Sequence, residues 1–290
     1  MKYYLLSFLL LTATGILGQN YHTVTYYTNN SVKLEMDIFQ PESISETLKP
    51  AFIYVHGGGF ASGQRSDGHA ICKYMSEHGY VAVTISYTLY MKDKSFSCDG
   101  ITSEKIKAIR YGTNDLWLAT IYLIENSDKF KINTSQIFIS GCSAGAETVL
   151  HAQFWNYQKM NWTDQKLPEN FRYAGVISGA GALMDLNLIN ENNLVPLMMF
   201  HGDKDNLVPY GTAAHHFCDP TATGWLMFFG SESIYEFIRN LNGTVKMYTF
   251  TGSGHEVANY YFEKEMNQVL EFCNSVIEGK HFQVSIEQKL

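Results

Sequence analysis

The chain alternates short, nearly continuous apolar runs with longer stretches in which apolar residues recur every three or four positions. The apolar runs are residues 52–55, 81–85, 137–140, 174–178, 197–200 and 245–250. The helical stretches are residues 69–78, 104–126, 144–157, 235–240 and 259–276. Runs of the first kind are typical of strands buried on both faces. Their alternation with helices predicts an α/β fold with βαβ units and a mostly parallel, doubly wound sheet.

The N-terminal part has a different pattern. Residues 21–28 and 32–39 alternate apolar and polar side chains, and the Asn-Asn-Ser segment 29–31 separates them. This pattern predicts a hairpin at an antiparallel edge of the sheet. With no internal repeat or long linker, residues 19–290 are predicted to form a single domain.

Two stretches fit the alternation poorly. Residues 92–102 are polar and contain a cysteine and a glycine, and residues 156–171 carry a tryptophan and a proline. Loops of this kind either cover a functional site or connect elements across the surface. The sequence leaves both interpretations open.

Composition supports one large core and excludes some partners. Of 290 residues, 46% are hydrophobic and 17% are charged, which is enough apolar material for a single domain. The net charge of −7 gives no basic surface for nucleic acid. The five cysteines are Cys72, Cys98, Cys142, Cys218 and Cys273. Their odd number leaves at least one unpaired, the pairing stays open, and no spacing typical of zinc sites occurs.

The first residues resemble a cleavable signal peptide. Lys2 supplies a positive charge, an apolar run covers residues 5–17, and the small residue Gly18 precedes the expected cut. The run is shorter than the ~20 apolar residues that span a bilayer. We therefore expect residues 1–18 to be removed, the protein to be secreted or periplasmic, and no stable membrane insertion.

A strand that leads into a G-x-S-x-G turn and then into a helix marks a candidate nucleophile. Gly141 and Gly145 flank Ser143, and residues 137–140 form the preceding strand. The turn needs small neighbours because the backbone folds back on itself there. It exposes the Ser143 hydroxyl and directs the helix N-terminus at the reacting oxygen, where negative charge is favoured.

A triple glycine follows the strand 52–55, directly after His56. Three glycines in a row cost backbone entropy, so close approach to the backbone is indicated. Acyl transfer gives a reason, because a tetrahedral oxyanion needs N–H donors without side chains in the way. We assign these donors to Gly58, Gly59 and Ala144. A phosphate loop is disfavoured because its Lys-Ser/Thr pair is missing.

Among the ten histidines, His255 is the candidate general base. It lies in a Gly-Ser-Gly-His-Glu segment immediately after the last strand, 245–250, on a loop flexible enough to reach back. His56 is expected to be structural, and His201 to brace the acid loop. His215 and His216 lie beyond that loop, in a stretch that could be helical. The others show no local signal: His22, His69, His78, His151 and His281.

The candidate acid comes from residues 201–209, after the strand 197–200. Asp203 and Asp205 both lie on this loop, so location alone does not choose between them. A buried Asp would accept the Nδ1–H of the base and stabilise the imidazolium.

Four motifs in this order, HGGGF, GCSAG, HGDKDNLVP and GSGHE, resemble the α/β-hydrolase superfamily. More narrowly they are similar to carboxylesterases related to hormone-sensitive lipase and to feruloyl and acetyl-xylan esterases. The resemblance spans residues 21–276 and implies the α/β-hydrolase fold, with Ser143, Asp205 and His255 as a triad and no cofactor or metal. Two positions depart from the pattern: Cys142 in the elbow, and residues 86–89, where relatives usually show Asp-Tyr-Arg.

The resulting expectation is a secreted serine carboxylesterase that hydrolyses a small-molecule, plant-derived or carbohydrate ester through an acyl-enzyme. A peptidase of the prolyl-oligopeptidase type shares the HGxxDxxVP pattern, but the HGGG loop and the absence of length for a propeller disfavour it. A non-catalytic binding protein of the same fold would be expected to lack a triad member, whereas all three are present.

Overall fold

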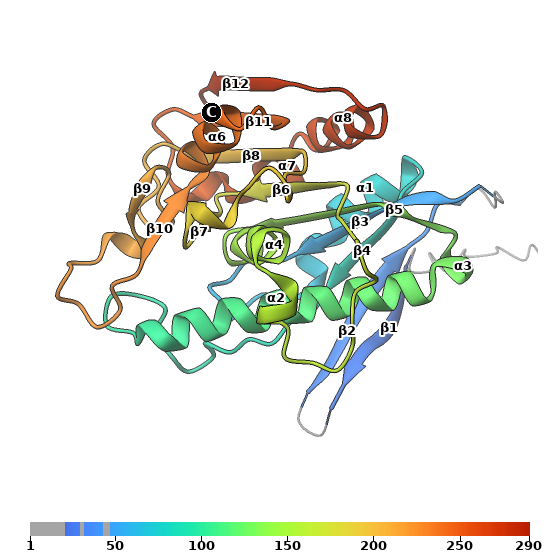
Figure 1. Cartoon of the computed structure of the whole chain (residues 1–290), viewed down its shortest axis with the longest axis horizontal. Helices are drawn as coiled ribbons and strands as arrows, with labels where there is room; N and C mark the ends of the chain where they lie inside the picture. Colours follow the sequence, from blue (N-terminus) through green and yellow to red (C-terminus); the bar gives the residue numbers. More distant parts are fainter. Residues whose placement is uncertain (1–20, 30–31, 43–46) are drawn as a thin grey trace, which may run out of the picture.

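A computed structural model describes residues 21–29, 32–42 and 47–290. The expected signal peptide, residues 1–18, lies outside the described residues. A nine-stranded sheet forms the centre, in the order β1-β2-β4-β3-β5-β6-β8-β11-β12 (Figure 1). Its strands are β1 (Tyr21–Thr28), β2 (Lys33–Phe39), β3 (Lys49–Val55), β4 (Val81–Ile85), β5 (Ile132–Cys142), β6 (Gly175–Gly179), β8 (Leu197–Gly202), β11 (Val245–Phe250) and β12 (Gln283–Gln288).

The pairing of these strands confirms the predicted fold class. From β4 to β12 all neighbours are parallel, while β1 pairs antiparallel with β2, and β2 antiparallel with β4. Each predicted apolar run coincides with one of these strands, the run 174–178 beginning one residue before β6, and the hairpin forms the antiparallel edge. This is the arrangement of the α/β-hydrolase fold.

Helices cover both faces of the sheet, because successive side chains of the buried strands point to opposite sides. Ile53 and Ile139 pack in the cluster that holds α2 (Thr102–Glu125), α4 (Ala144–Phe154) and α6 (Ser231–Asn240). The neighbouring Phe52 and Phe138 pack with α1 (His69–Glu77), α7 (Tyr260–Glu263) and α8 (Met266–Ile277). Two short helices, α3 (Ser127–Phe130) and α5 (Tyr157–Met160), complete the set of α-helices in the described residues.

Three features differ from the predicted elements. The helix expected over 259–276 is divided into α7 and α8, and a 3-10 turn, η4 (His255–Asn259), precedes them. The strand β12 was not expected, because its alternating polar sequence suits an exposed edge rather than a buried strand. A small antiparallel sheet joins β7 (Ala182–Leu183), β10 (Met227–Gly230) and β9 (Thr212–Ala214). Two further 3-10 turns are η1 (Arg65–Gly68) and η2 (Leu186–Leu188).

The carboxyl ends of β3, β5, β8 and β11 each carry one of the sequence motifs. Parallel strands bring these ends to the same edge of the sheet, where ligands bind in open α/β sheets. Among the described residues, no helix has both the length and the apolar character needed to cross a bilayer.

Candidate active site

Ser143 lies on the sharp turn between β5 and α4. Its backbone has φ 51° and ψ −122°, a strained conformation for a residue with a side chain. Only glycine fits at the two flanking positions, because a Cβ there would clash with the backbone. A Cβ on Gly141 would lie 2.5 Å from the Gly145 backbone, and one on Gly145 would lie 2.1 Å from the carbonyl oxygen of Val55. The sequence therefore folds into a turn that holds the Ser143 side chain in one place.

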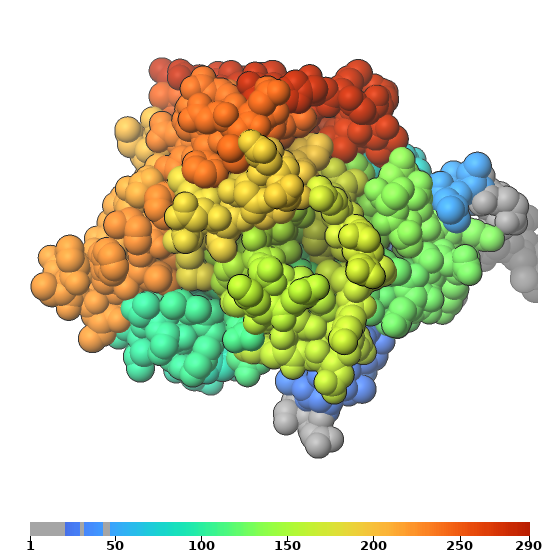
Figure 2. Space-filling view, viewed as in Figure 1, coloured from blue at the N-terminus to red at the C-terminus, as the bar shows by residue number. Residues whose placement is uncertain are grey.

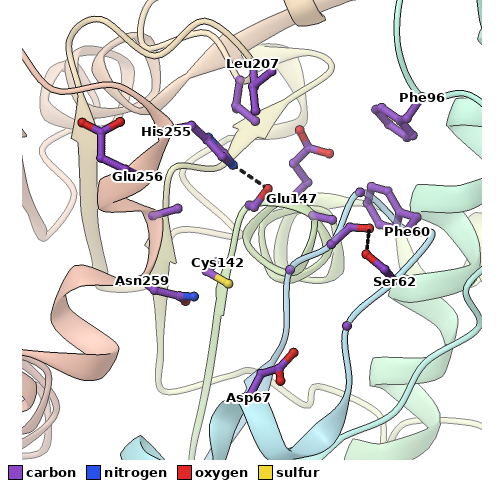
Figure 3. A pocket seen from close by; sticks show the side chains of 18 of the residues that line it. Phe60, Ser62, Asp67, Phe96, Cys142, Glu147, Leu207, His255, Glu256 and Asn259 are labelled. Atoms are coloured by element: carbon purple, nitrogen blue, oxygen red, sulfur yellow. Dashed lines mark hydrogen bonds between the residues drawn. The ribbon is translucent and has the colours of Figure 1, made fainter.

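His255 contacts the Ser143 hydroxyl directly. Its Nε2 lies 2.8 Å from Ser143 Oγ, as the dashed line at His255 in Figure 3 shows. His255 begins η4, on the loop that follows β11. The fold thus brings together two residues that are 112 positions apart.

Asp205 lies on the other side of His255 and extends the row of contacts that begins at Ser143. Its Oδ2 lies 2.6 Å from His255 Nδ1 and 3.1 Å from His201 Nε2. Its Oδ1 accepts the backbone N–H groups of Leu207 and Val208. Burial alone would raise the pKa of this carboxyl, but hydrogen bonds from His201 and His255 outweigh burial and hold the pKa well below its usual range. Asp205 is therefore a carboxylate at neutral pH.

Asp203 points elsewhere. Its Oδ1 accepts the N–H of Gly252 at 2.6 Å, and its Oδ2 lies 3.6 Å from Lys204 Nζ on the surface. The structure thus places Asp205, and not Asp203, against the candidate base. His201 also has the place expected for a brace, because its other ring nitrogen, Nδ1, lies 2.9 Å from Ser231 Oγ.

The triple-glycine loop after β3 lines the space in front of Ser143. Gly58 and Gly59 have φ of 107° and 60°, values that favour glycine. In the described part of the chain, their N–H groups donate to no backbone carbonyl. The N–H of Ala144 belongs to the first turn of α4, where no intrahelical acceptor exists. The three N–H groups assigned to the oxyanion site are therefore available to a ligand.

His56 and Tyr87 hold this loop from behind. The His56 ring is buried, stacks on Tyr87 with centroids 4.5 Å apart, and places Nδ1 2.8 Å from the Gly57 carbonyl oxygen. The Tyr87 hydroxyl donates to the His56 carbonyl at 3.1 Å. Tyr87 belongs to the segment that departs from the usual Asp-Tyr-Arg pattern. It is the one residue that this segment shares with the pattern, and it is the residue that contacts the loop.

A pocket of about 690 Å³ opens over these groups (Figure 3). Phe60, Phe96 and Leu207 give it apolar walls. Its acidic lining residues are Asp67, Glu147, Glu256 and Glu263. Coulomb repulsion from four carboxyl groups disfavours an anionic substrate, so the pocket suits a neutral or cationic ligand.

The two poorly patterned stretches have different places. Phe96, from the stretch 92–102, lines the Ser143 pocket. Trp162, from the stretch 156–171, lines a separate pocket of about 560 Å³ with Tyr111 and Asp115. Only the first stretch therefore reaches the candidate site.

A disulfide joins Cys98 of the first stretch to Cys218. These cysteines are 120 residues apart, which is why the sequence could not indicate the pair. Thr102 also donates to the carbonyl of Trp225. In Figures 1 and 2 the segment around residue 98 accordingly lies against the segment around residue 220. Cys72, Cys142 and Cys273 are buried and unpaired.

The pocket residues that the sequence interpretation missed include Glu147, His215 and His216. Glu147 lies one turn after Ser143 on α4, and the two histidines form the 3-10 turn η3 (His215–Phe217). The stretch around these histidines carried no motif. Only the position of Glu147, on the pocket end of the helix after the nucleophile, could have indicated it.

Comparison with known proteins gives three findings. The BD-FAE family model matches residues 36–194, which include the triple-glycine loop and Ser143. An AB hydrolase superfamily protein of Schizosaccharomyces pombe is 30% identical over 110 residues, 37% of this chain and 28% of that protein. Juvenile hormone esterase of Tribolium castaneum is 24% identical over 174 residues, 58% of this chain and 27% of that protein. The matches thus span less than a third of these two relatives.

Solved structures show the same fold. Esterase 2 of Thermogutta terrifontis, solved after phosphorylation by paraoxon, superposes with a TM-score of 0.64. The match covers 87% of this chain and 93% of that chain, at 15% sequence identity. Asp205 and His255 lie beyond the matched family segment, so their assignment depends on the motifs and on the geometry described above.

Proposed function

Because this chain belongs to the BD-FAE family of α/β-hydrolases, we propose that it is a serine carboxylesterase with Ser143, His255 and Asp205 as its catalytic residues. The observation that carries the proposal is the continuous row of contacts from Ser143 Oγ through His255 to Asp205, at 2.8 and 2.6 Å. The row ends in the pocket, beside the free N–H groups of the triple-glycine loop. Acyl transfer needs this combination of nucleophile, base and oxyanion donors.

In the first half of the reaction, His255 Nε2 takes the proton from Ser143 Oγ as Oγ attacks the acyl carbon. The carbonyl oxygen becomes an oxyanion, which the N–H groups of Gly58, Gly59 and Ala144 stabilise. The tetrahedral intermediate collapses, the bond to the alcohol oxygen breaks, and His255 gives its proton to the leaving alcohol. A water molecule, deprotonated by His255, then attacks the acyl-enzyme and releases the acid and Ser143.

Asp205 orients the base throughout. As a carboxylate it only accepts hydrogen bonds, so it keeps the proton of neutral His255 on Nδ1 and leaves Nε2 free to accept from Ser143. When His255 becomes an imidazolium, the buried negative charge stabilises it. Asp205 is held by two N–H groups and His201, which limits its movement.

The substrate is proposed to be a small-molecule or carbohydrate ester with a short acyl group. The pocket volume and its acidic lining support a compact neutral substrate rather than a fatty acyl chain. We expect acetyl and butyryl esters of 4-nitrophenol to be hydrolysed with a higher kcat/KM than the palmitoyl ester, by about tenfold or more. Steady-state kinetics with the three esters checks this. Faster turnover of the palmitoyl ester than of the butyryl ester would indicate a lipase instead.

A peptidase is disfavoured by the same site. The oxyanion donors Gly58 and Gly59 lie on a triple-glycine loop that lines the pocket, whereas peptidases of the prolyl-oligopeptidase type usually build the oxyanion site differently. A binding protein that does not catalyse would have little use for a strained serine in contact with a histidine.

We propose further that the protein is exported and that its mature form begins close to Gln19. The motivation is Lys2 with the apolar run 5–17, and the Cys98–Cys218 disulfide adds support because such bonds persist in oxidising compartments. N-terminal sequencing of exported protein is expected to start within a few residues of Gln19. Exported protein that still begins with Met1 would refute cleavage.

A further inference from the structure

A second row of polar side chains runs through the wall of the pocket. Glu147 Oε1 lies 2.9 Å from His215 Nε2, and His215 Nδ1 lies 2.6 Å from His216 Nδ1. Glu147 and His215 are buried, whereas His216 is partly exposed, and all three line the pocket. The row therefore leads from the buried carboxyl of Glu147 to the ring of His216 at the pocket surface. The proposed reaction uses none of these residues.

With Glu147 as a carboxylate and His215 neutral, the row fixes which nitrogen carries each proton. The Glu147 carboxylate accepts only, so His215 donates from Nε2. A neutral His215 then accepts at Nδ1, and His216 must donate from its own Nδ1. This leaves Nε2 of His216 as an acceptor. Among the described residues, that nitrogen contacts no hydrogen-bond partner.

The surroundings keep His216 neutral. Burial, followed by the repulsion that a proton on His215 would exert and by the charge of Lys105, lowers the pKa of His216 to about 4. Lys105 is fully buried and donates from Nζ to the Gly224 carbonyl at 2.5 Å. A cation in this position makes a second positive charge on the His216 ring unfavourable. His216 therefore accepts hydrogen bonds at the pH of ordinary esterase assays.

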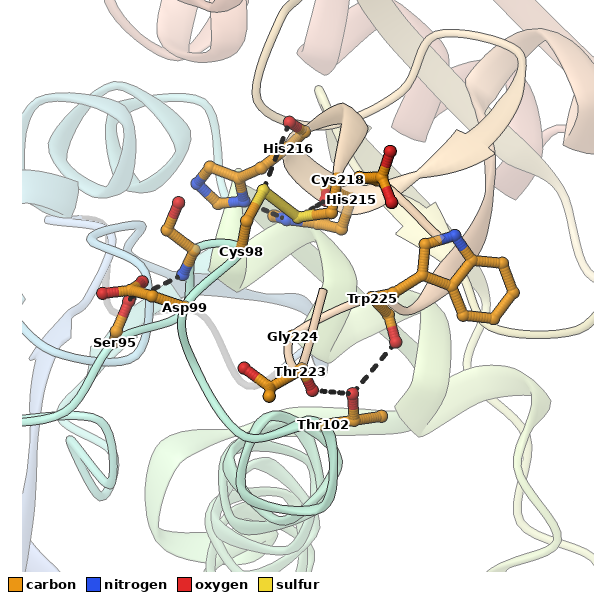
Figure 4. The surroundings of a disulfide bond; sticks show 12 residues. Ser95, Cys98, Asp99, Thr102, His215, His216, Cys218, Thr223, Gly224 and Trp225 are labelled. Carbon is orange, nitrogen blue, oxygen red and sulfur yellow. Dashed lines mark hydrogen bonds between the residues drawn. A yellow bond between two sulfur atoms is a disulfide. The ribbon is translucent and has the colours of Figure 1, made fainter. Parts of the chain in front are cut away.

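The backbone holds the ring in an unusual conformation. His216 has φ 58° and ψ 15°, and Phe217 has φ 52°. The N–H of His216 donates to the Leu207 carbonyl at 2.8 Å, and the Cys98–Cys218 disulfide anchors the chain two residues later (Figure 4). Strain of this kind persists where the surrounding structure fixes it, and it is concentrated at functional sites.

We infer that Glu147, His215 and His216 form a subsite that binds a hydroxyl group on the alcohol part of the ester, with His216 Nε2 as the acceptor. The inference rests on the proposed function, because it concerns the substrate of the same pocket. The alcohol side is indicated because the N–H of His216 donates to the carbonyl of Leu207, on the loop that holds Asp205 against His255, and His255 gives its proton to the leaving alcohol. The expected substrates are esters of polyols or sugars, in which a free hydroxyl lies near the ester oxygen.

Two acetate esters of nearly the same shape test the subsite. In 2-hydroxyethyl acetate a hydroxyl replaces the terminal methyl group of propyl acetate. The wild-type protein is expected to prefer the hydroxylated ester by roughly fivefold to tenfold in kcat/KM, because one hydrogen bond to His216 Nε2 is gained. Between 2-methoxyethyl acetate and butyl acetate no such preference is expected, since an ether oxygen cannot donate.

Two variants test the row itself. In His216→Phe the acceptor is lost while a ring remains, and the neighbouring Phe217 shows that phenylalanine adopts this backbone conformation. In Glu147→Gln the side-chain shape is kept, but the amide can donate to His215 and so permits the opposite tautomers. His216→Phe should bring the ratio for the first ester pair to about one, and Glu147→Gln should lower it. The control His78→Gln, at the end of α1, should keep the wild-type ratio.

The outcomes separate the two proposals. If the wild-type protein hydrolyses neither acetate and does not react with paraoxon, the proposed function fails. If it hydrolyses both acetates without preference, or if folded His216→Phe keeps the wild-type ratio, only the subsite is overturned. An equal preference for the methoxy ester would also overturn it, because His216 would then be a donor. Circular dichroism and the melting temperature identify variants that fail to fold.

Discussion

Replacing Ser143 by alanine is expected to reduce ester hydrolysis by a factor on the order of 10⁶ while the protein stays folded. The Ser143 Oγ is the only atom of the row that bonds to the acyl carbon, so its removal leaves His255 and the oxyanion donors without a nucleophile. Alanine is smaller than serine and adds no new contact in the turn. The initial rate of 4-nitrophenyl acetate hydrolysis, at matched protein concentrations, measures the loss.

A serine away from the pocket provides the control. Ser275 lies on α8 and does not line the pocket, so Ser275→Ala should keep nearly the wild-type rate. The melting temperature of Ser143→Ala should stay close to that of the wild-type protein. Residual turnover above about a hundredth of the wild-type rate would mean that another group attacks the ester.

Replacing Asp205 by asparagine is expected to lower turnover by a factor on the order of 10⁴ near pH 7. Asparagine keeps the shape, but its amide can donate to His255 Nδ1 and so hold the imidazole in the tautomer that cannot accept from Ser143. The negative charge that stabilises the imidazolium is also lost. The variant is measured by kcat and KM for 4-nitrophenyl acetate, with the loss expected in kcat.

Asp203→Asn is the matched comparison, because both residues lie on the same loop. The Asp203 carboxyl accepts the N–H of Gly252, and an asparagine oxygen can accept the same bond. Most of the activity should therefore remain. If Asp203→Asn is the more damaging variant, the acid has been assigned to the wrong residue.

Much of the fold could be predicted from the sequence because the central strands are buried on both faces. Such strands are continuous apolar runs, and all six were located, as was the N-terminal hairpin. The glycine motifs could also be recognised in the sequence, because the constraint that requires glycine acts locally. The clashes that a Cβ would make at Gly141 and Gly145 are local, so the requirement for glycine is visible in the sequence.

Features that depend on distant contacts could not be predicted. The strand β12 is exposed at the sheet edge, so burial does not impose an apolar run on it. The Cys98–Cys218 disulfide and the Glu147–His215 contact join residues 120 and 68 positions apart. Glu147, His215 and His216 acquire a shared surface only when α4 and the loop after β9 meet, and no local pattern indicates that meeting.

The choice of the triad acid also depended on a distant contact. Asp203 and Asp205 could not be separated by their place on the loop. The structure shows two different partners, the Gly252 N–H for Asp203 and the His255 ring for Asp205. The difference arises from how the loop after β8 packs against the loop after β11, which is a tertiary contact.

Reaction with paraoxon followed by peptide mass spectrometry tests the central claim most directly. Thermogutta terrifontis esterase 2, which shares this fold, has been solved in a form phosphorylated by paraoxon. We expect one diethyl phosphate per molecule, on the peptide that contains Ser143, with activity lost in proportion to labelling. Ser143→Ala should remain unlabelled. A wild-type protein that hydrolyses esters but is not labelled, or is labelled on another residue, would contradict the assignment of Ser143 as the nucleophile.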